Sequence, residues 1–281
     1  MKKCMVFGNC QISLITRYLL LSKTFSSYYQ IIDVPPVFLC DQKGLNRDDV
    51  KKCNLFIYQK IGDAFGKNLS TDYLLNCLPD TCQTISFTNT YFTGYHPEYV
   101  HNEVHRPDPR YNPLPNGKFP YGDKNIINLL KEGKSKNEIA EILWDDNFYS
   151  YEEVKANLDM TLDDLNKREE DLDVKAADFI RKNYRENRLF YTINHPTYLV
   201  TRHVAMGILR KMGLPEWEIS AIVDDPFKGH LHVPYYPSVI KHLQLSFIDK
   251  NHRYSLYYDL DKTLVTFKEY IYKYVDYVTG V

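Results

Sequence analysis

The chain begins with MKKCMVFGNCQ, residues 1–11, in which a short apolar run is followed by a glycine and a polar turn. Residues 3–7 are predicted to form a buried strand, and Gly8 lets the backbone turn sharply after it. The apolar run over residues 12–21 then has the composition of a helix. This opening predicts a strand, a tight turn and a helix, which is the first unit of an α/β fold.

The polar turn itself is a candidate for chemistry. Asn9 is a good helix N-cap, so Cys10 and Gln11 are predicted to lie on the first helical turn. A thiol there meets the positive end of the helix dipole and unpaired backbone N–H groups, and both favour the thiolate. Cys10 is therefore a candidate nucleophile whose neighbours are candidate oxyanion donors. The alternative is that Cys10 is a small core residue, since cysteine usually behaves as a buried hydrophobe.

The alternation of strands and helices continues through the first hundred residues. Besides the first strand and a helix over 10–25, we expect strands over 30–34, 54–59 and 84–87, and a helix over 71–78 that Ser70 caps. Such alternation with short connections predicts a parallel, Rossmann-like sheet with helices on its faces. Ligands of such sheets bind beyond the carboxyl ends of the strands, which is the edge where Cys10 is expected.

The rest of the chain predicts further segments of one composite domain. We expect an N-terminal α/β part (1–106), a proline-rich loop (107–122), a helical insertion (123–186), and a returning strand followed by C-terminal helices (187–281). The loop holds too many prolines for regular structure, and it is either a lid over the site or a crossover. Capping boxes at Ser135 and Ser150 mark two of the helices in the insertion, and the charged residues there are expected to be solvated.

Composition excludes several classes of function. The 35 basic and 36 acidic residues are balanced, which gives no support for a nucleic-acid binder. No apolar run is long enough for a transmembrane helix, and the apolar run before Gly8 is too short for the hydrophobic region of a secretory signal. We therefore expect a cytoplasmic protein. The six cysteines form no CxxC pair, so reduced thiols are expected, with no disulfide framework and no metal site.

Two His-Pro dipeptides follow segments that resemble strands. His96 comes after Tyr95, and His195 comes after Asn194. Proline keeps the preceding residue out of the helical region, so each imidazole is held at a strand end or a tight turn. The apolar run LFYTI, residues 189–193, is predicted to be a strand that brings His195 to the edge of a sheet, as the first strand brings Cys10.

A neutral imidazole within about 3 Å of a thiol or alcohol acts as a general base and then as a general acid. We therefore expect His195 to meet Cys10 at one edge of the fold. His96 is expected to shape the pocket together with Tyr95. The simpler reading of each histidine is that it caps a turn or satisfies a nearby carbonyl group.

These motifs together resemble a known family. GNCQ at residues 8–11, YHP at 95–97 and NHP at 194–196 are similar in sequence and order to the WcbI-type polysaccharide biosynthesis family, which is regarded as acetyltransferases. The resemblance extends to about residue 214. It implies an α/β part distantly similar to the SGNH-hydrolase sheet, with a cysteine where that fold carries serine. The DxxH block of SGNH enzymes is not evident before His195, so a third member of a triad is unassigned.

The resemblance implies acyl transfer, with acetyl the expected group, from coenzyme A to a sugar hydroxyl in surface or capsular polysaccharide synthesis. By this analogy Cys10 is the nucleophile and His195 the base. The oxyanion and substrate-positioning residues are Gly8, Asn9, Gln11, Asn194, His96 and Tyr95, and the cations expected to bind the phosphates of coenzyme A are Arg106, Arg110 and Lys118.

Several alternatives stay open. Cys10 forms an acyl-enzyme, or His195 activates the sugar for direct attack on the thioester. The partners are then acyl-CoA, a glycan acceptor and an assembly for polysaccharide synthesis. The competing functions are an SGNH-like esterase that deacetylates glycans, and a non-catalytic module that binds a glycan or a nucleotide.

Overall fold

The structure is a computed structural model, and it describes residues 1–41, 43–102, 104, 118–221, 225, 227–256 and 264–281. These residues form two compact units, each built from three stretches of the chain. Unit 1 comprises residues 1–91, 164–181 and 196–225, and unit 2 comprises residues 92–163, 182–195 and 226–281. The division into four successive segments of one composite domain stays a prediction.

Unit 1 contains a four-stranded parallel sheet with the order β2-β1-β3-β4. The strands are β1 (Lys2–Phe7), β2 (Tyr29–Ile32), β3 (Leu55–Gln59) and β4 (Gln83–Phe87). The α/β fold and its parallel sheet are therefore confirmed. The central strands β1 and β3 are apolar along nearly their whole length because helices cover both faces of the sheet.

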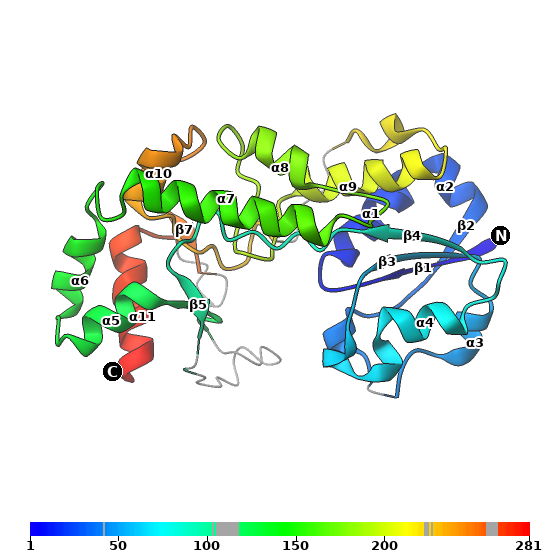
Figure 1. Ribbon diagram of the computed structural model, residues 1–281, viewed down its shortest axis with the longest axis horizontal. Helices are drawn as coiled ribbons and strands as arrows, with labels where there is room; N and C mark the ends of the chain where they lie inside the picture. The colour runs from blue at the N-terminus through cyan, green and yellow to red at the C-terminus, as the bar shows by residue number, and fades with distance from the viewer. Residues whose placement is uncertain (42, 103, 105–117, 222–224, 226, 257–263) are drawn as a thin grey trace. The chain divides into compact units, whose positions relative to one another are not determined.

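The helices of unit 1 lie on both faces of the sheet (Figure 1). One face carries α1 (Ile12–Leu21), α2 (Lys23–Tyr28) and α9 (Tyr198–Lys211), and the other carries α3 (Arg47–Lys51) and α4 (Thr71–Cys77). Short 3-10 turns lie at Val37–Leu39, Asp63–Phe65, Lys67–Leu69 and Glu216–Ile219. A hydrophobic core lies between the sheet and the helices α3 and α4. In it Phe7 of β1 stacks on Phe56 of β3 with ring centroids 6.1 Å apart, and Leu74 of α4 packs in the same cluster.

The helix predicted over residues 10–25 is interrupted at Ser22. The Ser22 hydroxyl accepts a hydrogen bond from the backbone N–H of Phe25 (3.0 Å) and so begins α2. The same hydroxyl donates to the Glu218 carboxylate (2.6 Å). A serine that finds local partners of this kind competes with the helical backbone, which explains the break.

Unit 2 is mainly helical and contains two short antiparallel pairs, β5 (Tyr99–His101) with β6 (Tyr121–Asp123) and β7 (Tyr254–Ser255) with β8 (Leu264–Val265). Its helices include α5 (Lys124–Lys131), α6 (Lys136–Leu143), α10 (Pro237–Leu243) and α11 (Phe267–Thr279), while α7 (Tyr151–Arg168) and α8 (Ala177–Asn183) contribute residues to both units. Both predicted capping boxes are present, at Ser135 and at Ser150.

The strand predicted over residues 189–193 is wrong. This apolar run is a buried, irregular segment in unit 2 and pairs in no sheet of the described chain. The backbone N–H of Tyr191 donates to the His195 carbonyl (3.0 Å), so the chain folds back on itself, and the Tyr191 carbonyl accepts from Val233 (3.0 Å). A short apolar run satisfies its backbone groups in a turn as well as in a sheet, and hydrophobicity alone does not distinguish the two.

All six cysteines are free thiols in the structure. Among the described helices, none combines the length and the apolar character that crossing a membrane requires.

Candidate functional site

The turn after β1 depends on a close approach that only glycine allows. A Cβ atom at Gly8 would lie 2.9 Å from Cδ of Gln59 and 2.9 Å from Cγ2 of Ile12. The Gly8 carbonyl accepts a hydrogen bond from the Val37 N–H (2.8 Å). The glycine predicted to permit a sharp turn therefore also lets the side chain of Gln59 reach the turn.

A network of buried amides holds this turn. Gln59, at the end of β3, is 0% exposed, and its Oε1 accepts from the N–H of Asn9 (2.8 Å). Its Nε2 donates to Oε1 of Gln11 (3.0 Å) and to the Thr88 carbonyl (3.3 Å). Gln11 Oε1 also accepts from the hydroxyl of Thr90 (3.0 Å), and Gln11 Nε2 donates to the Thr90 carbonyl (3.2 Å). The Gln11 amide thus makes its hydrogen bonds within the protein and fixes the turn against β3 and the residues after β4.

Cys10 lies just before helix α1. Regular α-helix begins at Ile12, and one turn precedes it. The Asn9 carbonyl accepts from Ile12 (3.1 Å) and the Asn9 side chain accepts from the Gln11 N–H (3.0 Å), so Asn9 caps this turn as predicted, and Cys10 lies within it. Burial raises the pKa of the Cys10 thiol to about 11, although its backbone hydrogen bond opposes this change. Burial therefore outweighs the helix start, which favours the thiolate, and the neutral thiol is the favoured form near pH 7.

Arg168 fixes the other side of the turn. Asn9 Nδ2 donates to Oδ1 of Asn89 (3.0 Å), and Arg168 donates to the carbonyl of Asn89 (2.8 Å) and to that of Tyr91 (2.9 Å). The sequence interpretation placed Arg168 on a solvated helix face, and this was wrong. Its guanidinium instead holds the segment that follows β4, to which the Asn9 amide is bonded.

In unit 2, His96 pairs with a carboxylate. The two side chains are almost fully buried, with His96 1% and Glu98 2% exposed, and His96 Nδ1 lies 2.9 Å from Glu98 Oε1. The imidazole also stacks on Tyr235, with ring centroids 5.2 Å apart and planes at 23°. Pro97, between the two residues, disfavours the helical conformation at His96, so the chain turns here rather than continuing as a helix.

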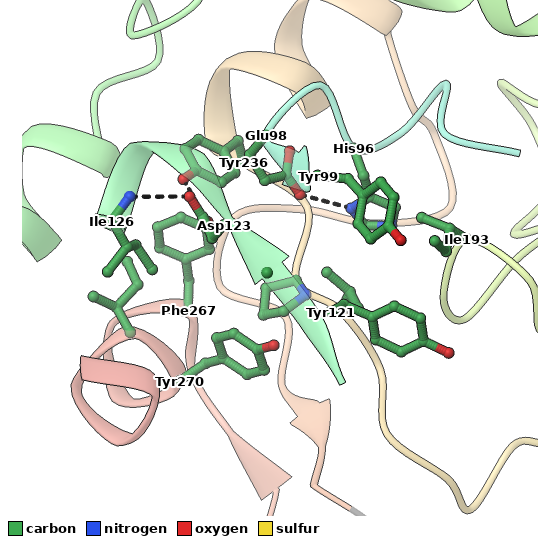
Figure 2. Close-up of a pocket in the computed structure, with 14 residues that line it drawn as sticks. His96, Glu98, Tyr99, Tyr121, Asp123, Ile126, Ile193, Tyr236, Phe267 and Tyr270 are labelled. Carbon is green, nitrogen blue, oxygen red and sulfur yellow. Dashed lines mark hydrogen bonds and ion pairs between the residues drawn. The ribbon is translucent and has the colours of Figure 1, made fainter. Parts of the chain in front are cut away.

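The pair lines a cavity of about 20 Å³ within unit 2, which is space for about one water molecule (Figure 2). Aromatic and aliphatic side chains and two carboxylates surround it. The lining residues include Glu98, Tyr99, Tyr121, Asp123, Ile193, Tyr236 and Tyr270. In the part of the chain that the structure describes, Nε2 of His96 and Oε2 of Glu98 are both buried and have no hydrogen-bond partner.

Asp123 is the second carboxylate of this cavity. Its Oδ1 caps α5 by accepting from the N–H groups of Asn125 (2.9 Å) and Ile126 (3.0 Å), and its Oδ2 accepts from the Tyr236 hydroxyl (2.8 Å). Figure 2 shows the Glu98 carboxylate between Asp123 and the imidazole of His96. Burial and the neighbouring Glu98 raise the pKa of Asp123 to about 7.

We expect D123N to remove part of the pH dependence of stability. Between about pH 4 and pH 7, folded Asp123 holds a proton that the unfolded chain has lost, so the native state loses stability as the pH rises. The unfolding free energy of D123N, relative to the native protein, should rise across this range, on the order of 1 kcal/mol per pH unit at most. Urea unfolding at pH 5, 6, 7 and 8 measures this, with the exposed D163N as control. An equal pH dependence in D123N and D163N would contradict the prediction.

The NHP motif lies against the same cavity. The Asn194 side chain accepts hydrogen bonds from the Tyr121 hydroxyl (2.6 Å) and from the Thr192 hydroxyl (3.0 Å). The carbonyl of Ile193, a cavity-lining residue, accepts from the backbone of Phe92 (2.7 Å). His96 and Asn194, about a hundred residues apart in sequence, are therefore both connected to this cavity of unit 2, Asn194 through its hydrogen bond with Tyr121.

His195 itself has a different environment from His96. Its ring stacks on Phe227 with centroids 4.5 Å apart and planes at 11°, and His230 contacts it edge-on. Burial, and secondarily the charge of His230, lower the pKa of His195 to about 3. The imidazole is therefore neutral near pH 7. Among the described residues no carboxylate bonds it, and its buried Nδ1 has no partner there.

The structure places the other predicted site residues as follows. Tyr95 is fully buried, donates to the Tyr184 carbonyl (2.7 Å) and packs edge-on against Tyr235, so it supports the wall behind His96. Lys118 is half-buried in unit 2. Arg106 and Arg110 lie outside the described residues.

Cys10 belongs to unit 1 and His195 to unit 2, so their predicted meeting stays a prediction. Sequence reasoning missed Glu98, Tyr121 and Asp123. A signal for Glu98 was present, because a carboxylate follows His96 by two residues across a proline.

Unit 1 contains a second pocket, of about 370 Å³. Three cations line it, Lys43, Arg47 and Lys51, together with uncharged residues such as Asn68 and Tyr73. Its charge suits an anion. The residues that the structure describes include no cluster of three or more side chains suited to hold a metal ion.

The parallel sheet, the thiol on the turn after its first strand and the histidine–carboxylate pair together define an α/β protein that carries side chains of the kind used in acid–base and nucleophilic catalysis. A family model described as "Polysaccharide biosynthesis enzyme WcbI" matches residues 3–217. The chain belongs to this family, and the resemblance inferred from the motifs is confirmed.

The solved structures include a similar fold. A structure of WcbI, described as a novel polysaccharide biosynthesis enzyme, aligns over 100% of this chain and 90% of that protein, with a TM-score of 0.84 and 23% identity. It is described as the native protein without a disulfide bond between coenzyme A and one of its cysteines. At this identity the likeness shows the shared fold. No protein in a search of curated sequences matches this chain.

Proposed function

We propose that this chain is a cytoplasmic, coenzyme A-dependent acyltransferase that transfers an acyl group, with acetyl the expected one, to a sugar hydroxyl during synthesis of a surface or capsular polysaccharide. The observation that carries the proposal is the Cys10 thiol on the turn after β1, which the amides of Gln59 and Gln11 hold at the carboxyl end of a parallel sheet. Family membership supports a role in polysaccharide synthesis. The description of the similar structure, which names coenzyme A together with a cysteine, supports the choice of donor.

In the first step, the Cys10 sulfur attacks the acyl carbon of the thioester. The thiol proton passes to the neutral imidazole of His195, the bond from carbon to the coenzyme A sulfur breaks, and the departing thiolate takes the proton back. The backbone N–H of Cys10 stabilises the oxyanion, since those of Asn9 and Gln11 hold the turn itself. The mechanism requires the Cys10 thiol and the His195 imidazole to act on one substrate.

The low pKa of His195 is compatible with this role only when the ligand is bound. In the absence of ligand, a pKa of about 3 makes the imidazole a weak base. The Cys10 sulfur gains negative charge as it attacks the bound thioester, and a nearby anion raises the pKa of an imidazole. We therefore expect His195 to become a stronger base in the complex.

Two groups of cations are candidates for the phosphates. The first is the predicted group of Arg106, Arg110 and Lys118, and the second is the group of cations at the pocket of unit 1. The double variant R47A/K51A, compared with K118A, separates them. The probe is 3′,5′-ADP, which carries phosphates without a thiol. The variant that removes the cations bound to the phosphates should weaken binding of this probe by at least about tenfold, and the other variant should not.

Thermal unfolding with coenzyme A tests the proposal. A ligand at a hundred times its Kd stabilises the folded protein by about 2.7 kcal/mol, so coenzyme A and acetyl-CoA should both raise the Tm by several degrees. Acetyl-CoA should also release free thiol when a glycan acceptor is added. An unchanged Tm with both ligands would contradict the proposal. Release of acetate from an acetylated glycan without coenzyme A would instead identify an esterase.

A further inference from the structure

Two buried polar atoms of the unit 2 cavity residues, Nε2 of His96 and Oε2 of Glu98, have no hydrogen-bond partner among the described residues. In the neutral tautomer of His96 that donates its Nδ1 proton to Glu98, the lone pair on Nε2 is an acceptor. Both oxygens of Asp123 already have donors. Nε2 of His96 and Oε2 of Glu98 are therefore two buried acceptors whose partner has to be a donor. A buried acceptor without a partner destabilises the folded protein, so the cavity favours a ligand that supplies an O–H or N–H group.

We propose that this cavity receives one hydroxyl group of the sugar acceptor, and that His96, held in place by Glu98, takes the proton of that hydroxyl. The inference rests on the proposed function and identifies where its acceptor reacts. His96 is then a catalytic residue, and Glu98 is a positioning residue that acts through it.

The size and walls of the cavity fit a hydroxyl on a larger molecule. The cavity of about 20 Å³ has room for a group the size of water but not for a whole sugar ring. Half-exposed Tyr99 and Tyr121 line it together with buried side chains, and their aromatic faces and hydroxyls suit the mixed surface of a sugar. The hydrogen bond from Tyr121 to Asn194 holds this wall in place.

The step balances without a further reactant. As the acceptor oxygen forms a bond to the acyl carbon, its proton moves to Nε2 of His96, and the Glu98 carboxylate stabilises the resulting imidazolium. The bond from the acyl carbon to the thiol sulfur then breaks, and the leaving sulfur takes the proton from His96. The products are the sugar ester and a free thiol.

The first test reads the tautomer of His96 by NMR of the ¹⁵N-labelled imidazole in the full chain. The pairing with Glu98 predicts a proton on Nδ1 and a bare Nε2 near pH 7. In E98Q the Nδ1 proton can still bond the amide oxygen, but the acceptor no longer carries a negative charge, so the tautomer with the proton on Nδ1 is less favoured. The two tautomers of His96 should then interconvert, and the ¹⁵N shifts of Nδ1 and Nε2 should move toward each other. Methanol, used as the hydroxyl probe, should shift the Nε2 signal in the native protein. A proton on Nε2 in the native protein would overturn the inference.

The second test uses methanol and methylamine as acceptors with acetyl-CoA as donor. Formation of methyl acetate should fall by about a hundredfold or more in H96Q and in E98Q, with little change in coenzyme A binding. H101Q and E132Q, two exposed positions in unit 2, are the matched controls. Because His96 is fully buried, E98Q, which changes charge but not shape, is the informative variant if H96Q does not fold.

The outcomes separate the two proposals. Methyl acetate formation at the native rate in folded E98Q, or N-methylacetamide as the main product in the native protein, would overturn the hydroxyl assignment while the acyltransferase proposal stands. If the native protein neither binds coenzyme A nor consumes acetyl-CoA, the proposed function fails, and with it the role of His96, even where NMR finds the expected tautomer.

Discussion

The variant C10A is expected to lose acyl transfer by a factor of about 10³ or more, since no neighbouring group replaces the sulfur as nucleophile. Its folding should change little, because Cys10 is only half-buried and its side chain holds no part of the amide network. Intact-protein mass spectrometry after incubation with acetyl-CoA measures the intermediate. The native protein should gain one acetyl group, and C10A should gain none.

The control for this experiment is Cys40, a second half-buried thiol of unit 1 whose Sγ donates to the Pro35 and Pro36 carbonyls. C40A should form the adduct as the native protein does. Turnover of C10A at the native rate would contradict the role of Cys10. Bound coenzyme A without an adduct, together with native turnover, would instead favour direct attack of the sugar on the thioester.

The variant Q59L is expected to lower the unfolding free energy by about 3 kcal/mol. Leucine has a similar volume, but it leaves the N–H of Asn9 and the carbonyl of Thr88 without their hydrogen-bond partner. It also removes one of the donors to Oε1 of Gln11. Each buried group that loses its hydrogen bond costs about 1–3 kcal/mol. Because the same bonds hold the turn that carries Cys10, adduct formation should also fall sharply.

Urea unfolding and the acetyl adduct measure the two effects of Q59L in one preparation. Q83L, at the exposed start of β4, is the matched control and should change stability by no more than about 0.5 kcal/mol. Equal stability of Q59L and Q83L would show that the amide network does not hold the turn.

Much of the fold follows from local sequence signals. The first strand has an apolar run that ends at a glycine, and the strands at 54–59 and 84–87 are bounded by polar residues. In each case the hydrophobic pattern and the length of the run both indicate a strand. The capping boxes at Ser135 and Ser150 were found because they depend on two residues three positions apart. Features of this kind are encoded within a few residues of one another.

The parts that sequence reasoning missed depend on residues far apart in the chain. Gln59 reaches a turn fifty residues earlier, and the Arg168 guanidinium, assigned to solvent, bonds carbonyl groups near residue 90. The pKa of Cys10 was judged from the helix end alone, whereas burial among distant residues decides it. The apolar run at 189–193 matched a strand in composition, but its backbone partners are in a turn.

The chain passes back and forth between the two units, because residues 164–181 and 196–225 return to unit 1 after unit 2 has begun. Neither unit is a continuous piece of sequence. A truncated gene product that stops near residue 160 would lack α9, which packs on α1, and would also lack α11, which packs on α6. We therefore expect such fragments to be degraded or insoluble, and a nascent chain to complete either unit only when synthesis is nearly finished.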